Sequence, residues 1–468
     1  MERKLPLKVK IGYGAGALSY GIPVQLVTGL FVFYSTAVLR LPGASVGLIL
    51  SISIVWDAFT DPVMGYISDK TSAGVLFGRR LFYVFTGALG LAVCNYLLWS
   101  VDPRAPYGVR IFELAALLML LKTFSTVLTT PYLALGSELT SDYTERTSVQ
   151  SFRTAFFFLG YMFPALAGMA LYFRPSPSYP NGQLNPGAYP PLGLTASALT
   201  IAFAAVCVFF TYKKSAAPET ARKRGFSFSG LFRETVEALK CPDYRNIALA
   251  LLFINMAMGI VGAAGMHVFT YTFGFSSYKI AVVFGSLFVA ALAAQPVWAA
   301  AAKKYEKRTA LKACLIIDVA VSAVFAALVL TSGWVSENYL CVVPAAVAMG
   351  FSLGGSIALP YSMIADTVDK DEYFSGVRKE GVFYGSATFM YKASQAVSAS
   401  AAGLYIDLVG FDPAVSQSQE LYQRLGLILP AGFLVCFAAA LFFTSKYTLD
   451  RAAVAYYQRG TRERGNGG

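Results

Sequence analysis

Residues 45–67 read SVGLILSISIVWDAFTDPVMGYI, an apolar stretch that contains two aspartates, Asp57 and Asp61. The stretch is long enough to cross a membrane as a helix, because about 20 apolar residues span the hydrocarbon core. Positions i and i+4 lie on one helix face, so the two carboxylates are expected to be neighbours. A charged side chain at the bilayer centre costs about 2.5–3.5 kcal/mol, so the pair needs a positive partner. We favour a mobile cation as that partner over the alternative that both acids only line a wet gap.

The whole chain has the composition of an integral membrane protein. Of its 468 residues, 56% are hydrophobic and 14% are charged, whereas soluble domains carry about 25% charged residues. We therefore expect an all-α membrane protein with twelve transmembrane helices. An enzyme is not expected, since the sequence offers no nucleophile–base set and no metal cluster. The predicted spans are residues 11–39, 45–67, 81–101, 111–136, 154–173, 193–212, 246–273, 279–302, 309–331, 339–364, 382–408 and 423–445.

The basic residues indicate the orientation of these spans. The net charge is +12, and most of the 38 Lys and Arg fall in the N-terminus, the loops after even-numbered spans and the tail. Because cytoplasmic loops are enriched in Lys and Arg, both termini are predicted to be cytoplasmic, in a plasma or inner membrane. The charge is thus a topology signal, and no nucleic acid is expected as a partner. The six cysteines show no CxxC spacing, so neither disulfides nor a metal site is expected.

One long polar interruption divides the spans into two groups of six. Residues 213–245 contain eight Lys and Arg and are predicted to be a cytoplasmic linker. The domains expected are therefore an N-terminal six-helix bundle at 1–212, this linker, a C-terminal bundle at 246–445 and a cytoplasmic tail at 446–468. We expect the end of the tail, residues 451–468, to be disordered.

The two halves repeat each other. Pro131 and its following tyrosine in the fourth span correspond to Pro360 and its following tyrosine in the tenth. Internal repeats of this kind are typical of secondary transporters. The second half has Ala291 and Gln295 where the first has its two aspartates. A purely structural role in the repeat should not need acids in one half only.

The cation site predicted from these residues contains oxygen ligands of two kinds. Asp57 and Asp61 supply carboxylates that can both ionise only beside a positive charge, such as sodium, lithium or a proton. Thr60 and Thr126 offer neutral oxygens, and Thr126 belongs to a polar stripe on the fourth span. The two aspartates are thus a hypothetical sodium site. No cofactor other than the coupling ion is expected.

Other intramembrane polar residues are interpreted one by one. Lys392 lies deep in the eleventh span and is predicted to be the electrostatic counterpart of the aspartates. Lys122 in the fourth span meets an anionic substrate or helps to balance Asp57, or else it lines a cavity. Asp318 in the ninth span and His267, the only histidine, are interpreted first as residues of the bundle interior.

The loop after the second span resembles the loop signature of the major facilitator superfamily. It reads GYISDK at residues 65–70, followed by Gly-Arg-Arg at 78–80. Such an Asp and Arg pair can latch the cytoplasmic ends of helices in one conformation. With a second charged loop after the fourth span, the predicted latch residues are Asp69, Arg79, Arg80, Glu145, Arg146 and Arg153.

Three further segments resemble the glycoside–pentoside–hexuronide:cation symporters, the melibiose permease group of that superfamily. They are WDAFTDP at residues 56–62, the Pro-Tyr to Arg segment at 131–153, and KEGVFYG with its later lysine at 379–392. The resemblance implies a fold of two six-helix bundles and alternating access. It also implies that Asp57 and Asp61 bind the coupling cation, that Thr126 assists and that Lys392 lies beside them.

The sugar site of that family carries over less well. The family holds sugar hydroxyls with an acid in helix one and another in helix four, and those places are Gly21 and Thr129 here. The sequence around residues 21–25 and 358–366 also resembles the sodium-dependent lysophosphatidylcholine symporters. The predicted function is sodium- or proton-coupled symport of a glycoside or similar small solute. The alternative is symport of a lysophospholipid or another amphipathic anion, and in either case by a monomer.

Overall fold

In the residues that the computed structural model describes, the regular elements are all helices, with one isolated antiparallel bridge between Ser176 and Tyr179. The described residues are 5–71, 78–140, 143–212, 236–415 and 417–466. By contacts the chain forms two compact units. Unit 1 comprises residues 1–226, 276–281 and 412–416, and unit 2 comprises residues 227–275, 282–411 and 417–468. Most of the predicted linker, residues 213–235, lies outside the described residues.

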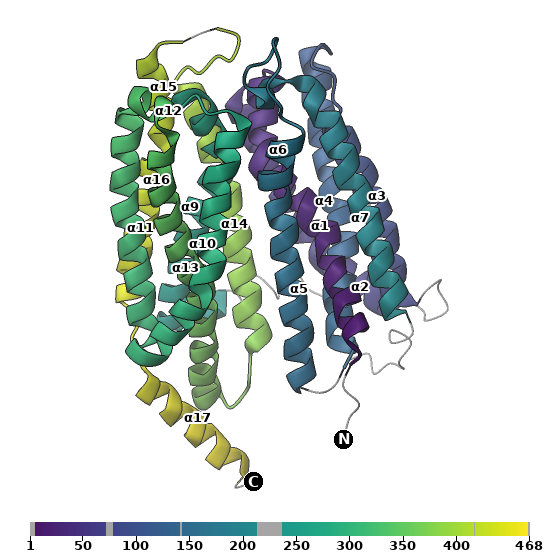
Figure 1. Cartoon of the computed structure of the whole chain (residues 1–468). Coiled ribbons are helices and arrows are strands. Elements are labelled where there is room, and N and C mark those ends of the chain that lie inside the picture. Colours follow the sequence, from purple (N-terminus) through teal and green to yellow (C-terminus); the bar gives the residue numbers. More distant parts are fainter. Residues whose placement is uncertain (1–4, 72–77, 141–142, 213–235, 416, 467–468) are drawn as a thin grey trace. The chain divides into compact units, whose positions relative to one another are not determined.

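Unit 1 contains the long helices of the first half of the chain (Figure 1). In it α1 packs against α5 and α7, α3 packs against α4 and α7, and α2 packs against α4. The central helix α1 is buried on nearly all sides because its sequence is rich in glycine and alanine, which permit close approach. The helices are α1 (Leu7–Phe33), α2 (Gly43–Lys70), α3 (Arg79–Leu98), α4 (Tyr107–Glu138), α5 (Tyr143–Phe163) and α7 (Tyr189–Thr211).

Unit 2 repeats this pattern of contacts. In it α9 packs against α14 and α16, and α11 packs against α13 and α16. Both α1 and α9 also end in a five-residue π-helical segment, η1 (Tyr34–Val38) and η5 (Val268–Thr272). The predicted internal repeat is therefore present in the fold. The helices are α9 (Pro242–His267), α10 (Ser277–Tyr305), α11 (Lys307–Leu330), α13 (Val342–Ser375), α14 (Glu380–Leu408) and α16 (Ile428–Ser445).

Short helices complete the described chain. They lie at the ends of the long helices or between them, as α12 and α15 do above α11 and α16 in Figure 1. They are α6 (Met169–Leu171), α12 (Ser332–Glu337), α15 (Gln419–Gly426), η2 (Pro164–Gly168), η3 (Gly182–Leu184), η4 (Pro186–Ala188) and η6 (Tyr339–Cys341).

Each of the twelve predicted spans coincides with a long helix, and eleven helices in the described chain are long and apolar enough to cross a membrane. The twelfth, α14, has 29 residues but is less apolar, since serines, Gln395 and Lys392 interrupt its sequence. Polar side chains in a membrane helix face the bundle interior, because lipid hydrocarbon offers them no hydrogen-bond partner. The polarity of α14 therefore favours a position that lines a polar interior.

The contact between α10 and α13 depends on glycine. A Cβ atom added to Gly350 would lie 2.1 Å from the carbonyl oxygen of Leu287, and one added to Gly354 would lie 2.5 Å from that of Ala291. Only a residue without a side chain lets these two backbones approach so closely.

Gly350→Ala is therefore expected to destabilise unit 2. Backbone atoms would have to move to admit the methyl group, at a cost of about 2 kcal/mol. Gly385→Ala on α14 is the matched control, because an added Cβ there meets no atom within 4 Å. Thermal unfolding of the purified variants measures the difference. Equal unfolding temperatures for the two variants would contradict the packing described.

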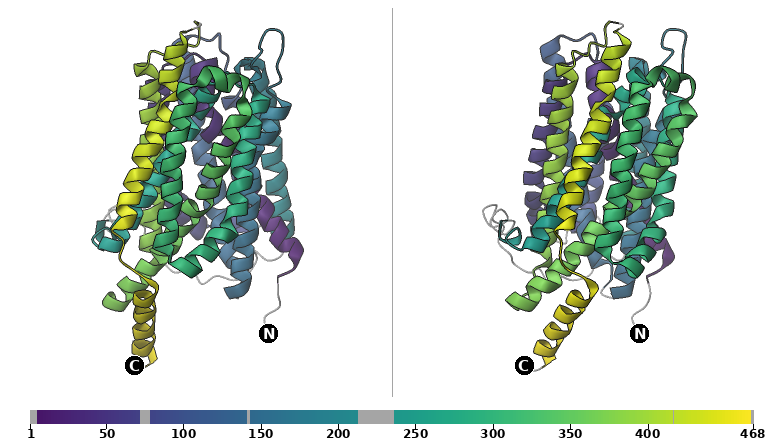
Figure 2. Two further views of the ribbon diagram at one scale, coloured as in Figure 1. Left: turned by 60° about the vertical axis from the view of Figure 1, so that its left-hand side comes forward. Right: turned by 90° about the vertical axis from the view of Figure 1, so that its left-hand side faces the viewer.

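The C-terminal tail is ordered, and the prediction that residues 451–468 are disordered is wrong for the described part. Helix α17 (Arg451–Asn466) lies at the end of unit 2 where α13 also ends (Figure 2). Its Tyr457 ring contacts Tyr373 and Phe374 of α13, and the Asp450 carboxylate accepts a hydrogen bond from the amide of Ala453 at its N-terminus. The aromatic contact and the cap stabilise a helix that the polar sequence alone would not form.

Candidate cation site

The two aspartates of α2 lie where this helix packs against α4. α2 remains helical through Pro62, so Asp57 and Asp61 stay one turn apart on the same face. Both side chains are half-buried. The helix thus holds the two acids side by side, on the face of α2 that contacts α4.

A threonine of α4 contacts both acids. The Oγ1 atom of Thr126, which is 1% exposed, lies 2.9 Å from Oδ1 of Asp57 and 2.9 Å from Oδ1 of Asp61. The two carboxylate oxygens can therefore be no farther apart than twice that distance. Thr60 of α2 completes the group, since its Oγ1 lies 3.4 Å from that of Thr126. The structure thus brings together the four residues of the predicted cation site.

This geometry cannot be satisfied by the hydroxyl alone when both acids are ionised. A threonine hydroxyl has one proton, so it can donate to only one carboxylate at a time. The second carboxylate would then face an oxygen lone pair and a like charge. A proton on one carboxyl, or a cation beside the oxygens, removes both repulsions.

The position of unit 2 that corresponds to Thr126 lies in a tight contact between helices. When Pro131 is matched to Pro360, Thr126 corresponds to Gly355. A Cβ atom on Gly355 would lie 2.5 Å from the sulfur of Cys314 and 2.8 Å from the indole of Trp298. The same pair of helices therefore packs tightly in one half of the repeat and holds a polar cluster in the other.

The two predicted lysines lie in different units. Lys122 is half-buried on α4, one turn before Thr126, and forms no hydrogen bond or ion pair with any described residue. Lys392 is half-buried on α14 of unit 2. Since each unit is described by itself, the predicted proximity of Lys392 to the aspartates stays a prediction.

Gly21 and Thr129 do not join the acid pair. Gly21 is buried against α5, where an added Cβ would lie 3.3 Å from the ring and the carbonyl oxygen of Phe157. This position is a contact between two helices. Thr129 is half-buried on α4, one turn after Thr126. No structural observation assigns a substrate role to either residue.

The predicted latch forms two separate groups in unit 1. In the first, the guanidinium of Arg80 donates to Oδ1 of Asp69 at 2.6 Å, to Oε1 of Glu138 at 2.9 Å and to the hydroxyl of Ser68 at 2.6 Å. Arg79 also donates to Glu138, at 3.2 Å. This group joins the ends of α2, α3 and α4.

The other predicted latch residues fasten α5 to α1. The carboxylate of Glu145 accepts hydrogen bonds from Nζ of Lys10 at 2.9 Å and from the amide of Leu5 at 3.0 Å. The guanidinium of Arg153 interacts with the side chain of Tyr20 on α1. The side chain of Arg146 lies outside the described residues.

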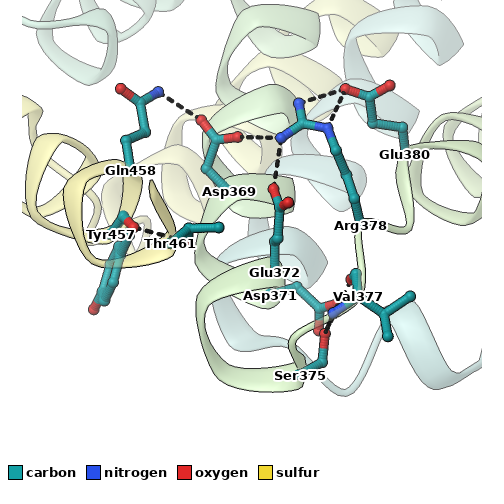
Figure 3. Close-up of polar contacts among 10 residues, drawn as sticks. All are labelled: Asp369, Asp371, Glu372, Ser375, Val377, Arg378, Glu380, Tyr457, Gln458 and Thr461. Atoms are coloured by element: carbon teal, nitrogen blue, oxygen red, sulfur yellow. Dashed lines mark hydrogen bonds and ion pairs between the residues drawn. The ribbon is translucent and has the colours of Figure 1, made fainter. Parts of the chain in front are cut away.

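Unit 2 has a charged cluster after α13, which Figure 3 shows. The Arg378 guanidinium donates to Asp369 at 3.1 Å, to Glu372 at 2.6 Å and to Glu380 at 2.9 Å. These acids, Glu380 first, raise the pKa of Arg378 above its ordinary value. Gln458 of α17 donates to the other oxygen of Asp369 at 2.7 Å. The tail helix, α13 and the start of α14 are thus connected through one arginine.

The charged groups at the ends of α4 and α13 include residues that were not among the predicted site residues. Glu138 ends α4 and accepts from both arginines of the first latch. In unit 2, Lys307 binds both oxygens of Asp366, at 2.7 and 2.8 Å. The repeat was the signal that could have identified them, since both acids follow the Pro-Tyr pair of their half by a similar distance.

Comparison with known families agrees with this architecture. A family model described as MFS/sugar transport protein matches residues 12–451. The inner membrane symporter YicJ of Escherichia coli is 26% identical over 458 residues, which are 95% of this chain and 92% of that protein. The putative glycoside/cation symporter YagG of the same organism is 24% identical and covers 97% of this chain and 95% of its own.

Animal transporters and solved structures match over similar lengths. The sodium-dependent lysophosphatidylcholine symporter 1-A of Danio rerio is 24% identical, over 97% of this chain and 88% of that protein. A crystal structure of the nucleoside transporter NupG superposes with a TM-score of 0.58 at 14% identity, covering 95% of this chain and 99% of that one. At this identity, the structural match shows the fold alone.

Proposed function

The chain belongs to the family of MFS/sugar transport proteins, and on that premise we propose that it is a cation-coupled symporter of a glycoside or a similar small polar solute. Secondary transport across a membrane is the general function of its symporter relatives, and none of those named is an enzyme. Sodium or a proton is the coupling ion of the proposal. We place both termini in the cytoplasm and the protein, as a monomer, in the inner or plasma membrane.

The observation that carries the proposal is the hydroxyl shared by two acids. Thr126 lies 2.9 Å from a carboxylate oxygen of Asp57 and of Asp61. A single hydroxyl proton can serve only one of these carboxylates at a time, and a sodium ion or a proton is small enough to supply positive charge beside their oxygens. When the occupant binds, the repulsion between the two carboxylates of α2 is removed. Binding thereby favours one conformation of unit 1. If the substrate prefers the same conformation, the cation raises the affinity for the substrate, and the substrate raises the affinity for the cation by the same factor.

Thr126→Val tests this proposal without changing the shape of the side chain. Loss of a hydrogen bond to a charged group costs about 1.5–3 kcal/mol, so the cation affinity is expected to fall about tenfold to a hundredfold. Sodium, lithium and proton titrations of the purified protein, followed by thermal stability, measure the affinity.

Thr123→Val is the matched control. Thr123 also lies between α4 and α2, where its hydroxyl accepts a hydrogen bond from the Trp56 indole at 2.9 Å, but no carboxylate is involved. Its removal should leave the cation affinity unchanged. Equal affinities in the wild type and Thr126→Val would argue against a cation at this place.

A second substrate class is favoured by Lys122. Lys122 lies one helical turn before Thr126 on α4 and forms no hydrogen bond or ion pair with a described residue. A phosphate head group would find a cationic partner there. Relatives of this chain include lysophosphatidylcholine symporters as well as a putative glycoside/cation symporter. Thermal stability against glycosides and lysophospholipids, each with and without sodium, separates the two classes, and Lys122→Ala should abolish only a response to lysophospholipids.

A further inference from the structure

Unit 2 holds an acid that the proposed function does not use. Asp318 lies near the middle of α11, about 17 Å from either end of the helix at 1.5 Å per residue. Its side chain is completely buried. An aspartate is too short to reach the membrane surface from that depth, so its carboxyl group must be satisfied inside the bundle.

The neighbours of this carboxyl group are neutral hydroxyls of α13. Ser356 donates to Oδ2 of Asp318 at 3.2 Å. Ser352 also interacts with the carboxyl, but its own proton is directed at the carbonyl oxygen of Cys314, 2.8 Å away. Toward Asp318 it can therefore present only a lone pair. A lone pair is a poor partner for a carboxylate, so Ser352 does not stabilise the ionised form of Asp318.

In the part of the chain that the structure describes, no positive charge compensates the acid. Among the described residues, its interaction partners are the two serines and the thiol of Cys314, and no Lys, Arg or His is among them. The third helix packed here, α16, has Cys436 as its one titratable side chain in the sequence Ile428–Ser445. One oxygen of the carboxyl group, Oδ1, is buried and has no hydrogen-bond partner in the described structure.

We propose that Asp318, Ser352 and Ser356 form a proton-binding site in unit 2, with the proton held on Oδ1 of Asp318. Ser356 donates to Oδ2, which leaves Oδ1 as the protonated oxygen. The ligand is a proton, because protonation makes the carboxyl group neutral. A neutral acid needs no positive partner, and the described neighbours of Asp318 include none. This site is distinct from the cation site of α2 and does not depend on the identity of the transported solute.

Infrared difference spectroscopy of the purified protein tests this proposal. The spectrum of the wild type minus that of Asp318→Asn is expected to contain one protonated-carboxyl C=O band that shifts in D₂O. Signals of Asp57 and Asp61 cancel in this difference. Asp407→Asn is the control, because this acid of α14 is exposed and its removal should take away no such band. A difference that contains only carboxylate bands would overturn the proposal and point to a metal cation instead.

A second variant serves if Asp318→Asn does not fold. Ser356→Ala removes the hydrogen bond to Oδ2 and keeps the acid. The protonated-carboxyl band should then move to higher frequency while its intensity stays. A shift confined to carboxylate bands, or no shift at all, would count against a proton at this site.

Discussion

Asp57→Asn is expected to abolish the cation dependence of transport and the accumulation of substrate, while exchange of substrate down its gradient continues. The variant keeps the size of the side chain and its ability to accept from Thr126, but it removes one of the two charges that attract the ion. The affinity for the coupling cation should fall at least about a hundredfold, because removing one partner of a buried charge pair costs about 3–5 kcal/mol. Uptake into proteoliposomes, with and without a sodium or proton gradient, measures both effects.

Substitution of the second aspartate, alone and together with the first, tests whether both acids belong to one site. Asp61→Asn should have the same phenotype, and the double variant should be no worse than either single one, because one site is lost in every case. Asp102→Asn, which lies in the loop between α3 and α4, should transport normally. Gradient-driven accumulation that survives in Asp57→Asn would remove the aspartates from the coupling mechanism.

Arg80→Ala is expected to have the second-largest effect, on stability and on the rate of transport. The side chain is 7% exposed and binds Ser68, Asp69 and Glu138, so its loss leaves three polar groups of α2 and α4 without their common partner. Breaking a buried pair costs about 3–5 kcal/mol. Because Asp69 is 60% exposed, screening by water reduces the expected loss to about 2–3 kcal/mol.

Graded substitutions distinguish this latch from general destabilisation. Arg80→Lys keeps the charge but cannot reproduce the forked contacts, so it should lie between Arg80→Ala and the wild type. Arg79→Ala loses the longer contacts to Glu138 at 3.2 Å and to the carbonyl oxygen of Asp69 at 3.3 Å, and should have a smaller effect. Thermal unfolding and initial transport rates order the variants. An Arg79→Ala variant as unstable as Arg80→Ala would contradict the division of roles.

The order of the C-terminal tail depends on its contact with α13. Residues 451–466 are polar and basic, and such composition indicates disorder when no partner is known. The structure supplies the partner, because Tyr373 and Phe374 at the end of α13 contact the tyrosines of α17. Because this helix is stabilised by contact with α13, the sequence of residues 451–466 alone does not indicate that it folds.

The sequence by itself determined the number and places of the membrane helices, because transfer of apolar side chains from water depends on composition and length alone. It also determined that Asp57 and Asp61 share a helix face, because their spacing of four residues sets this within one helix. Only the tertiary structure decided which α4 residue meets them: Thr126 lies against both acids, whereas Thr129 and Lys122 on neighbouring turns do not bind them in the described contacts. It likewise decided that Glu138 joins the latch and that Asp318 faces two serines. These pairings depend on how far each helix is rotated and shifted against its neighbour, which is set by close packing at residues such as Gly87 and Gly354 and not by the pattern of any one segment.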